Sequence, residues 1–226
     1  MPPSPRDLFA ETSVQALFPT CVWVCDLKPE VHEPMNRRLL ATLDALTDPK
    51  PALPPGRNWQ TEQTLHEVPE FAELMEIGVL AARGVLDAIA VKYTDIMITG
   101  AWANINPKGA GHPPHIHPNN YLSGVYYLHA PTGGDSITFH DPRKQIDLIS
   151  PEVKKPNVYN SPIHMVKIQS GRMMLFPAWL GHSVVANQNQ ELRVSVSLNF
   201  MFPNFAETMG QPKWPGLPLK RTGGSG

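Results

Sequence analysis

Hydrophobic residues in the first ninety positions follow two different periods. Residues 17–27 form a short run rich in Val, Trp and Cys, which is typical of a strand. Residues 30–46 and 70–91 instead carry apolar side chains three and four positions apart, which places them on one face of a helix. Pro69 precedes the second stretch, where proline suits a helix start. The pattern therefore predicts one strand followed by two amphipathic helices.

The character of the chain changes after Lys92, where helical spacing gives way to short β-type runs. Glycine-, proline- and asparagine-rich turn signals separate these runs. The runs fall at residues 95–105, 122–129, 136–139, 163–168, 172–177, 183–186 and 192–202. Several short strands at such spacing predict a sandwich or barrel, with the two helices packed on its outside. We expect a single domain over residues 1–219, with a helical part at 28–91, a β core at 93–202 and a flexible tail at 220–226.

Composition narrows the class of protein. The chain has 226 residues, of which 42% are hydrophobic and 17% charged, so it is globular. Its formal net charge is -1 and no Lys/Arg-rich run is present, which argues against nucleic acid as the partner. No stretch has the length of a membrane span and no apolar signal region opens the chain, so we expect no membrane partner.

The two cysteines, Cys21 and Cys25, lie four positions apart in the predicted first strand. On a strand their Cα atoms would be about 13 Å apart. A disulfide needs less than about 7 Å, so we expect both thiols to be reduced, which fits the cytoplasm.

Three histidines form the candidate metal site. His115 and His117 are two positions apart, and on an extended segment such residues point to the same face. Pro114 and Pro118 bracket the pair and restrict the local backbone. A third ligand must come from elsewhere in the chain, and His182, beside a predicted strand, is the best candidate. Imidazole suits iron(II), zinc, copper and nickel, so the ligand type alone does not choose the metal.

Other histidines show no such pattern. His112 is either a further ligand or a neighbour of the ligands. We interpret the rest as structural residues: His32, His66, His129, His140 and His164.

These motifs resemble those of the 2-oxoglutarate- and iron(II)-dependent oxygenases, most closely the prolyl-hydroxylase-like branch and its group of mostly uncharacterised bacterial and phage proteins. The resemblance rests on residues 115–128, 171–177, His182 and 193–195, and it extends to 17–20 and 102–106. It implies a mainly β fold with flanking α-helices around a double-stranded β-helix (jelly-roll, cupin-like) core. It also implies Fe(II) as cofactor and 2-oxoglutarate as cosubstrate.

The metal motif of that superfamily is His-x-Asp/Glu, a distant His, and an Arg or Lys about ten residues later. By the resemblance, His115 and His182 match the two histidines, and Arg193 would pair with the far carboxylate of 2-oxoglutarate. His117 departs from the pattern, because it stands where the carboxylate usually lies. Either three histidines bind the metal, or only His115 and His182 do. A carboxylate supplied by Asp135 or Asp141 is the less favoured alternative.

The cosubstrate side of the site can also be argued from chemistry. A buried dicarboxylate needs a fixed cation, and guanidinium offers a two-pronged donor. On a strand Ser195 shares the face of Arg193 and can donate a further hydrogen bond; the competing interpretation pairs Arg193 with Glu191 at the surface. Ser123 and Tyr127 share one strand face, and Tyr127 either reaches the cosubstrate or is a core aromatic residue. The remaining candidate for the cosubstrate pocket is Asn104, which shares a strand face with Trp102.

The sequence thus predicts a 2-oxoglutarate-dependent dioxygenase that hydroxylates a C–H bond and releases succinate and CO2. Two alternatives stay open: a three-His cupin-type dioxygenase that does not use 2-oxoglutarate, and a non-catalytic metal-binding cupin-like protein. The substrate, a small molecule or a peptide, is not defined by the sequence. The oligomeric state also stays open, with a homodimer as the favoured alternative.

Overall fold

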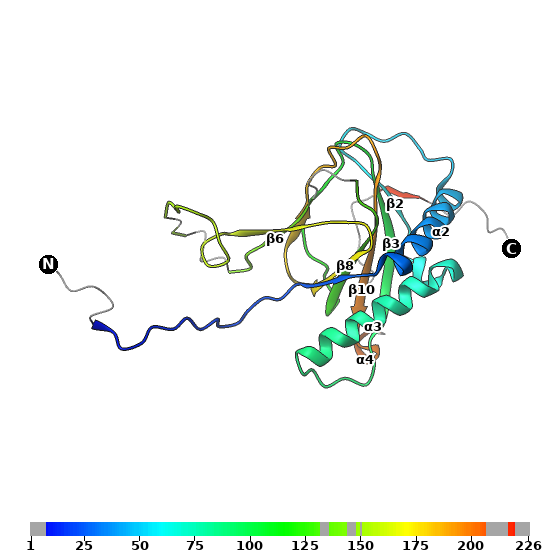
Figure 1. Ribbon diagram of the computed structural model, residues 1–226. Helices are drawn as coiled ribbons and strands as arrows, with labels where there is room; N and C mark the ends of the chain where they lie inside the picture. Colours follow the sequence, from blue (N-terminus) through cyan, green and yellow to red (C-terminus); the bar gives the residue numbers. More distant parts are fainter. Residues whose placement is uncertain (1–7, 132–135, 144–147, 150, 207–216, 220–226) are drawn as a thin grey trace.

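Two mainly antiparallel sheets face each other, and two long helices cover the outside of the larger one (Figure 1). The computed structural model describes residues 8–131, 136–143, 148–149, 151–206 and 217–219. The expected tail at 220–226 lies outside the described residues.

The larger sheet has seven strands in the order β1-β8-β5-β10-β3-β2-β11, and the smaller has four in the order β4-β9-β6-β7. From β3 to β10 the chain passes repeatedly between the two sheets, which makes a double-stranded β-helix. The larger sheet contains β1 (Trp23–Asp26), β2 (Trp59–Thr61), β3 (Met97–Asn106), β5 (Leu122–His129), β8 (Arg172–Pro177), β10 (Arg193–Met201) and β11 (Leu217–Leu219). The smaller sheet contains β4 (His112–His115), β6 (Ser136–His140), β7 (Ile163–Lys167) and β9 (His182–Val184).

The helices are α2 (Pro29–Thr47) and α3 (Ala72–Ala88), with 3-10 turns η1 (Leu65–Glu67) and η2 (Pro69–Phe71) before α3 and a short α4 (Pro203–Ala206) after β10. Both long helices bury their apolar stripes against the larger sheet. Gly78 of α3 allows a close approach, because a Cβ there would lie 3.4 Å from Leu198 of β10. None of the described helices is long and apolar enough to cross a lipid bilayer.

Two hydrophobic cores result from this layering. The main core lies between the helices and the larger sheet. A smaller core lies between the two sheets and contains Val125, Ile137, Phe139 and Phe176. The rest of the space between the sheets is lined largely by polar side chains.

The predicted helices and the seven predicted strands of the β core are confirmed, with shifted ends. The first strand is shorter than the expected 17–27, because only Trp23–Asp26 pairs with β8 and Phe18 takes a positive φ of 55°. Helix α3 ends at Ala88 rather than at 91, since Ala90 also has a positive φ, of 54°. Sequence reasoning missed β2, β4, β11 and α4, which are three or four residues long. In β4, two consecutive prolines hide the strand pattern.

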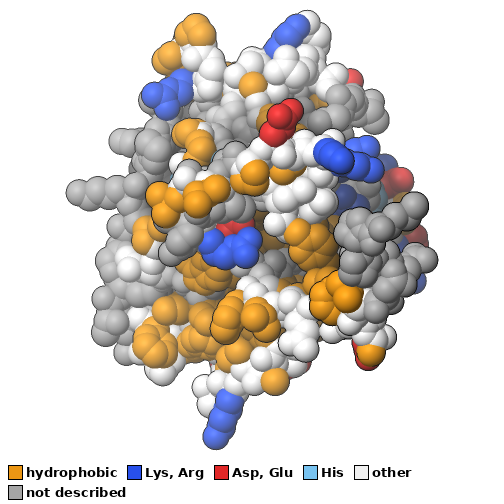
Figure 2. All heavy atoms as spheres, turned by 90° about the vertical axis from the view of Figure 1, so that its left-hand side faces the viewer, with side chains coloured by type: hydrophobic (Ala, Val, Ile, Leu, Met, Phe, Trp, Pro, Cys, Tyr) orange, Lys and Arg blue, Asp and Glu red, His pale blue; other side chains and the backbone are white. Residues whose placement is uncertain are grey.

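The face that carries the β6–β7 region exposes many apolar side chains, as Figure 2 shows. The exposed apolar residues of this region include Leu148, Ile149, Val158, Tyr159, Ile163 and Met165. These side chains therefore lie outside both cores of the chain.

A buried polar contact fixes α2 to the larger sheet. The side-chain amide of Asn36 donates to the carbonyl of Leu128 at 2.8 Å, and the Tyr126 hydroxyl donates to Asn36 Oδ1 at 2.8 Å. Burial raises the pKa of Tyr126, so its hydroxyl keeps its proton and remains a donor. This contact sets the position of α2 along β5.

Replacing Asn36 with leucine, which has a similar size, should lower the free energy of unfolding by about 2–4 kcal/mol, because two buried polar groups lose their partner. Urea denaturation measures this loss. Arg37→Leu, at the exposed neighbouring position, is the matched control and should change stability by less than about 0.5 kcal/mol. Equal stability of the two variants would show that the buried contact contributes nothing.

Candidate active site

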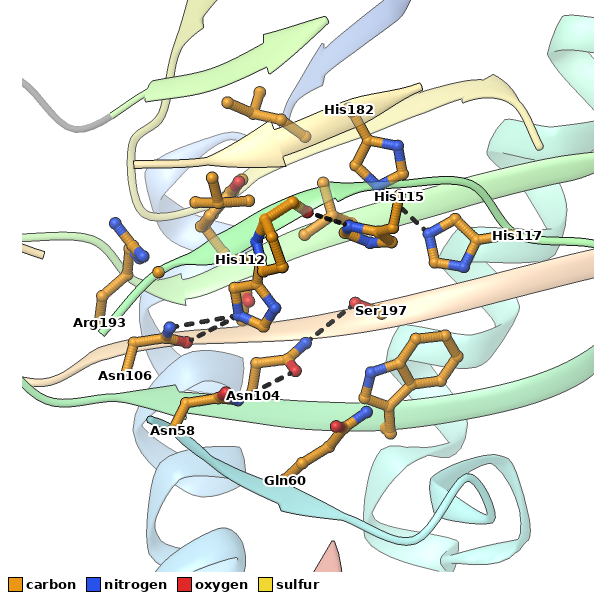
Figure 3. A pocket seen from close by; sticks show the side chains of 18 of the residues that line it. Asn58, Gln60, Asn104, Asn106, His112, His115, His117, His182, Arg193 and Ser197 are labelled. Carbon is orange, nitrogen blue, oxygen red and sulfur yellow. Dashed lines mark hydrogen bonds between the residues drawn. The ribbon is translucent and has the colours of Figure 1, made fainter. Parts of the chain in front are cut away.

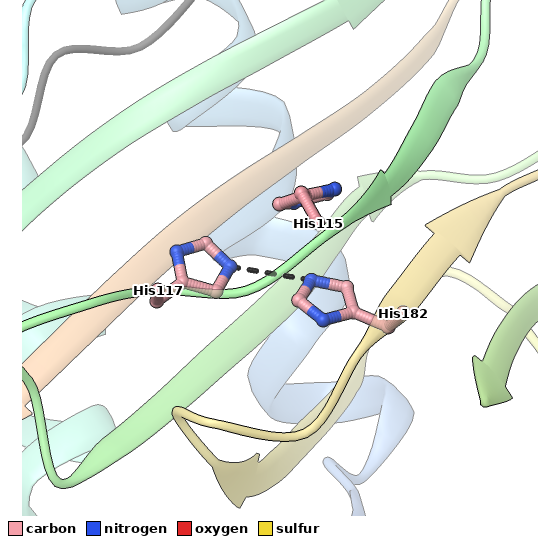
Figure 4. Close-up of side chains that lie close together, drawn as sticks. All are labelled: His115, His117 and His182. Carbon is pink, nitrogen blue, oxygen red and sulfur yellow. Dashed lines mark hydrogen bonds between the residues drawn. The ribbon is translucent and has the colours of Figure 1, made fainter. Parts of the chain in front are cut away.

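Three histidine side chains converge between the sheets, and they are the three that the sequence singled out. His115 ends β4, His117 follows two residues later, and His182 begins β9. One ring nitrogen from each lies within 4.8 Å of the others. Figure 4 shows the three rings turned toward a common point. Among the described residues, this is the one group of three or more His, Cys, Asp or Glu side chains with such spacing.

Strand pairing creates this convergence. His115 lies directly opposite His182 in the β4–β9 pair, and Phe139 of β6 pairs with His182 on its other side. The backbone N–H of His117 donates to the carbonyl of Ala178 at 2.9 Å, which holds the segment after β4 against the loop before β9. Gly111 lets the two segments approach, because a Cβ there would lie 2.7 Å from the carbonyl oxygen of Val184. The site thus depends on a short strand pair with very little free space.

Backbone carbonyls orient two of the rings. His115 Nδ1 lies 2.8 Å from the carbonyl oxygen of Pro113, and His182 Nδ1 lies 3.0 Å from that of Leu180. A carbonyl can only accept, so in each ring Nδ1 carries the proton and donates it. The Nε2 atom of each ring therefore keeps its lone pair. This arrangement is common among histidines that bind metal ions.

The donor set fits a transition-metal ion. Burial lowers the pKa of His117 to about 2 and that of His182 to about 3, and it also lowers the pKa of His115, so all three rings are neutral near pH 7. The Nε2 atoms of His117 and His182 are 3.2 Å apart. Two nitrogens bound at about 2.1 Å to one ion at a right angle would be about 3 Å apart. Three neutral imidazoles in this geometry can hold an ion such as iron(II).

The histidines border a cavity of about 590 Å³ between the sheets. Figure 3 shows the histidines on one side of it, Arg193 at another end, and a group of amide side chains opposite. Its charged lining residues are Arg57 and Arg193, and no acidic side chain lines it in the described part of the chain. A cavity of this size holds a small ligand.

Arg193 is a large charged side chain that is almost fully buried, with an exposed fraction of 2%. It begins β10, and its Nη2 donates to the carbonyl of Ala110 at 3.3 Å. The surface partner considered above, Glu191, instead contacts His129 at 2.9 Å. A buried guanidinium on a cavity wall favours a bound anion.

His112 lies between Arg193 and the three histidines. Its Nε2 is 3.2 Å from Asn106 Nδ2, and its ring centre is 6.3 Å from that of His115. Burial, followed by the nearby charges of His115 and Arg193, lowers its pKa to about 4. His112 is therefore a neutral cavity residue outside the three-histidine group.

Three other predicted residues also line the cavity: Ser195, Tyr127 and Asn104. Ser123 does not, because its side chain lies beyond the lining residues and its hydroxyl donates to Asn199 Oδ1 at 2.8 Å. Asp141 forms an ion pair with Arg143 and is not part of the histidine group, whereas Asp135 lies outside the described residues.

Sequence reasoning missed part of the amide-lined wall. Asn58 lies just before β2, Gln60 lies within β2, and Asn106 ends β3. All three side chains belong to residues that line the cavity. Only the pairing of Gln60 with Asn104, across β2 and β3, places that side chain on the cavity. A three-residue strand carries too short an alternation to be recognised in a sequence.

Comparisons with protein families and solved structures show what this chain is similar to. Residues 100–199 match the model of the family described as "Putative 2OG-Fe(II) oxygenase", where 2OG is 2-oxoglutarate. This segment contains all three histidines and Arg193. Over these 100 residues the chain is similar to the 2OG-Fe(II) oxygenases. No curated protein matches the chain significantly.

Several solved structures share the fold. HygX from Streptomyces hygroscopicus, with nickel and 2-oxoglutarate bound, matches with a TM-score of 0.56 at 13% identity, over 81% of this chain and 83% of that one. A prolyl-4-hydroxylase from Pseudomonas putida matches with a TM-score of 0.54 at 12% identity, over 81% and 93%. SnoN, a non-heme alpha ketoglutarate dependent epimerase from nogalamycin biosynthesis, gives 0.56 at 14%, over 89% and 90%. At these identities the likeness establishes the double-stranded β-helix.

Removing one histidine of the group tests the metal site directly. His182→Ala should weaken Fe(II) binding by more than about 100-fold, since losing a ligand costs more than losing a residue that only orients one. Anaerobic isothermal titration calorimetry measures this change. His164→Ala, on the exposed part of β7, is the control and should bind like the unmodified protein. Parallel titration of His117→Ala distinguishes a three-histidine site from one made of His115 and His182 alone. The two-histidine site predicts unchanged Fe(II) affinity for this variant, whereas the three-histidine site predicts weaker binding.

Gly111→Ala should weaken Fe(II) binding by about 10- to 100-fold while every ligand remains, because the added methyl group pushes β4 away from β9. The same titration gives the affinity. Gly84→Ala is the matched control, since a Cβ there meets nothing within 4 Å. Unchanged affinity in Gly111→Ala would show that the β4–β9 approach does not position the ligands.

Proposed function

We propose that the protein is an Fe(II)- and 2-oxoglutarate-dependent oxygenase that hydroxylates a C–H bond of its substrate. The observation that carries this proposal is the layout of one cavity. Three neutral histidines converge at one side, and the buried guanidinium of Arg193 lies at another end (Figure 3). A metal ion together with a dicarboxylate is the ligand pair that this layout suits.

His115, His117 and His182 would hold the iron through ring nitrogens. The carbonyls of Pro113 and Leu180 fix the orientation of two of these rings before any metal binds, so little conformational entropy remains to be lost. Iron(II) bound together with 2-oxoglutarate supplies the activation of dioxygen, with succinate and CO2 as co-products.

Arg193 would bind the distal carboxylate of 2-oxoglutarate. The guanidinium already lies buried in the cavity wall, so only the entering anion, and not the arginine, has to lose its hydration. Ser195, two positions along the same face of β10, and Tyr127 of the neighbouring strand β5 lie opposite each other in the strand pairing. Both residues line the same cavity, but Tyr127 also belongs to the smaller core and its hydroxyl is buried, so Ser195 would supply the added hydrogen bond to the bound anion.

The absence of a carboxylate at position 117 is compatible with this cosubstrate. Three imidazoles add no charge, so the metal would keep both of its positive charges. The carboxylate of 2-oxoglutarate that Arg193 does not bind would neutralise one of these two charges directly. Because no acidic residue lines the described cavity, an anionic ligand meets no repulsion there.

Apolar side chains would keep this part of the cavity dry. Val125, Ile137 and Phe176 line it and belong to the smaller core between the sheets. The ring of Phe176 packs against His182 with centres 4.6 Å apart. Exclusion of water strengthens electrostatic contacts and protects reactive species from side reactions.

Anaerobic addition of Fe(II) and then 2-oxoglutarate to the apoprotein should produce a visible metal-to-ligand charge-transfer band. Arg193→Ala should weaken 2-oxoglutarate binding by at least about tenfold, since a hydrogen-bonded charge contributes about 1.5–3 kcal/mol. Arg143→Ala removes an exposed guanidinium elsewhere and should leave the band unchanged.

The same titration distinguishes the alternatives. Fe(II) binding without any band would contradict the use of 2-oxoglutarate and would favour a three-His dioxygenase, which His117 specifically suggests. A band that Arg193→Ala leaves intact at the same 2-oxoglutarate concentrations would overturn the role of Arg193 alone.

A further inference from the structure

The wall opposite the histidines contains a glutamine that is well placed to select the substrate. Gln60 lies in β2, where it pairs with Asn104 of β3, and both side chains line the cavity. Figure 3 shows the Gln60 amide on the side of the cavity away from the three histidines. A ligand that contacts Gln60 therefore occupies a different part of the cavity from one that contacts Arg193.

Gln60 differs from its neighbours in its hydrogen bonding. Asn104 Nδ2 donates to Ser197 Oγ at 3.0 Å, and Asn58 Nδ2 donates to the carbonyl of Trp59 at 3.1 Å. Gln60 as a residue is only 9% exposed, it lines the cavity, and no described residue makes a hydrogen bond with its side-chain amide. A ligand in the cavity can therefore bind this amide without displacing a protein partner from it.

The chemistry of the glutamine amide limits the matching group. Whichever way the amide is turned, it presents a donor N–H and an acceptor oxygen side by side. A carboxylate only accepts hydrogen bonds and an ammonium only donates them, so each pairs with either the N–H or the oxygen of the glutamine amide but not with both. Another uncharged amide satisfies both halves at once.

The charges of the cavity also favour an uncharged substrate over a positively charged one. Its charged lining residues in the described chain are Arg57 and Arg193. Two cations and no anion disfavour a positively charged substrate. Trp102 also lines the cavity, with its ring centre 5.9 Å from that of His117, and it offers a flat apolar surface close to the histidines.

We infer that Gln60 is a specificity-determining residue that binds an uncharged amide group of the substrate. This inference rests on the proposed function, because it assigns the substrate of the same cavity. The amide is either a peptide bond or the carboxamide of a small molecule, since both present the same donor and acceptor.

Binding of small probes tests this inference without turnover. Benzamide, methyl benzoate and benzamidinium have similar shapes, but only benzamide is neutral with both a donor and an acceptor. Their dissociation constants for the Zn(II)-loaded protein with 2-oxoglutarate can be measured by ligand-detected NMR. Benzamide should bind about five to ten times more tightly than either of the others, the ratio expected for one or two neutral hydrogen bonds.

Two substitutions assign the preference to Gln60. Gln60→Met keeps a long unbranched side chain and should remove the preference for benzamide. Gln60→Glu should reverse it in favour of benzamidinium, which a misfolded protein would not do. Gln63→Met is the matched control, because Gln63 does not line the cavity, and it should bind all three probes like the unmodified protein. Equal binding of the probes, or a preference that survives in Gln60→Met, would overturn the inference.

The source of the amide and the proposed function are tested separately. N-acetylglycine N-methylamide carries peptide bonds, so tighter binding of it than of benzamide supports a peptide source, and the opposite order supports a small molecule. The charge-transfer titration is run in parallel with Fe(II) on apoprotein from the same purification. An amide preference without the band would overturn the oxygenase proposal and leave Gln60 as a binding residue, whereas a band without the preference would overturn the inference alone.

Discussion

The alternation of side chains along β10 is the constraint on which both the fold and the cavity depend. This central strand lies between β3 and β5, and successive residues point to opposite faces. Val194, Val196 and Leu198 enter the main core beneath the helices, whereas Arg193, Ser195 and Ser197 line the cavity. A shift of one residue in the pairing would exchange the two sets. Stability of the core therefore maintains the position of the buried guanidinium.

The cavity divides its chemistry between two walls. The histidine wall comes from the smaller sheet and the segment after β4, and it is neutral because burial depresses the pKa of each ring. The opposite wall comes from β2 and β3 and consists of amide side chains. Charge in the described lining comes from arginines alone, so the cavity as a whole is suited to anionic and neutral ligands.

The smaller sheet has the weaker structural support. Its strands β4 and β9 have four and three residues, and their pairing is irregular between His112 and His115. The hydrogen bond from His117 to Ala178 and the absence of a side chain at Gly111 compensate for this short pairing. The metal site is thus held by close backbone contacts rather than by a large apolar core.

The two helices, most of the strands and the three histidines could be predicted from the sequence, because these depend on local periodicity and on ligand chemistry. Arg193 was singled out by the resemblance to the 2-oxoglutarate-dependent oxygenases. The folded arrangement was needed to show that Ser123 lies away from the cavity and that Gln60 lies on it. Gln60 lies on the cavity because it is part of the three-residue strand β2. This strand forms by pairing with β3, which lies more than forty positions away in the sequence. Such pairing depends on contacts distant in sequence, and no local pattern of residues records it.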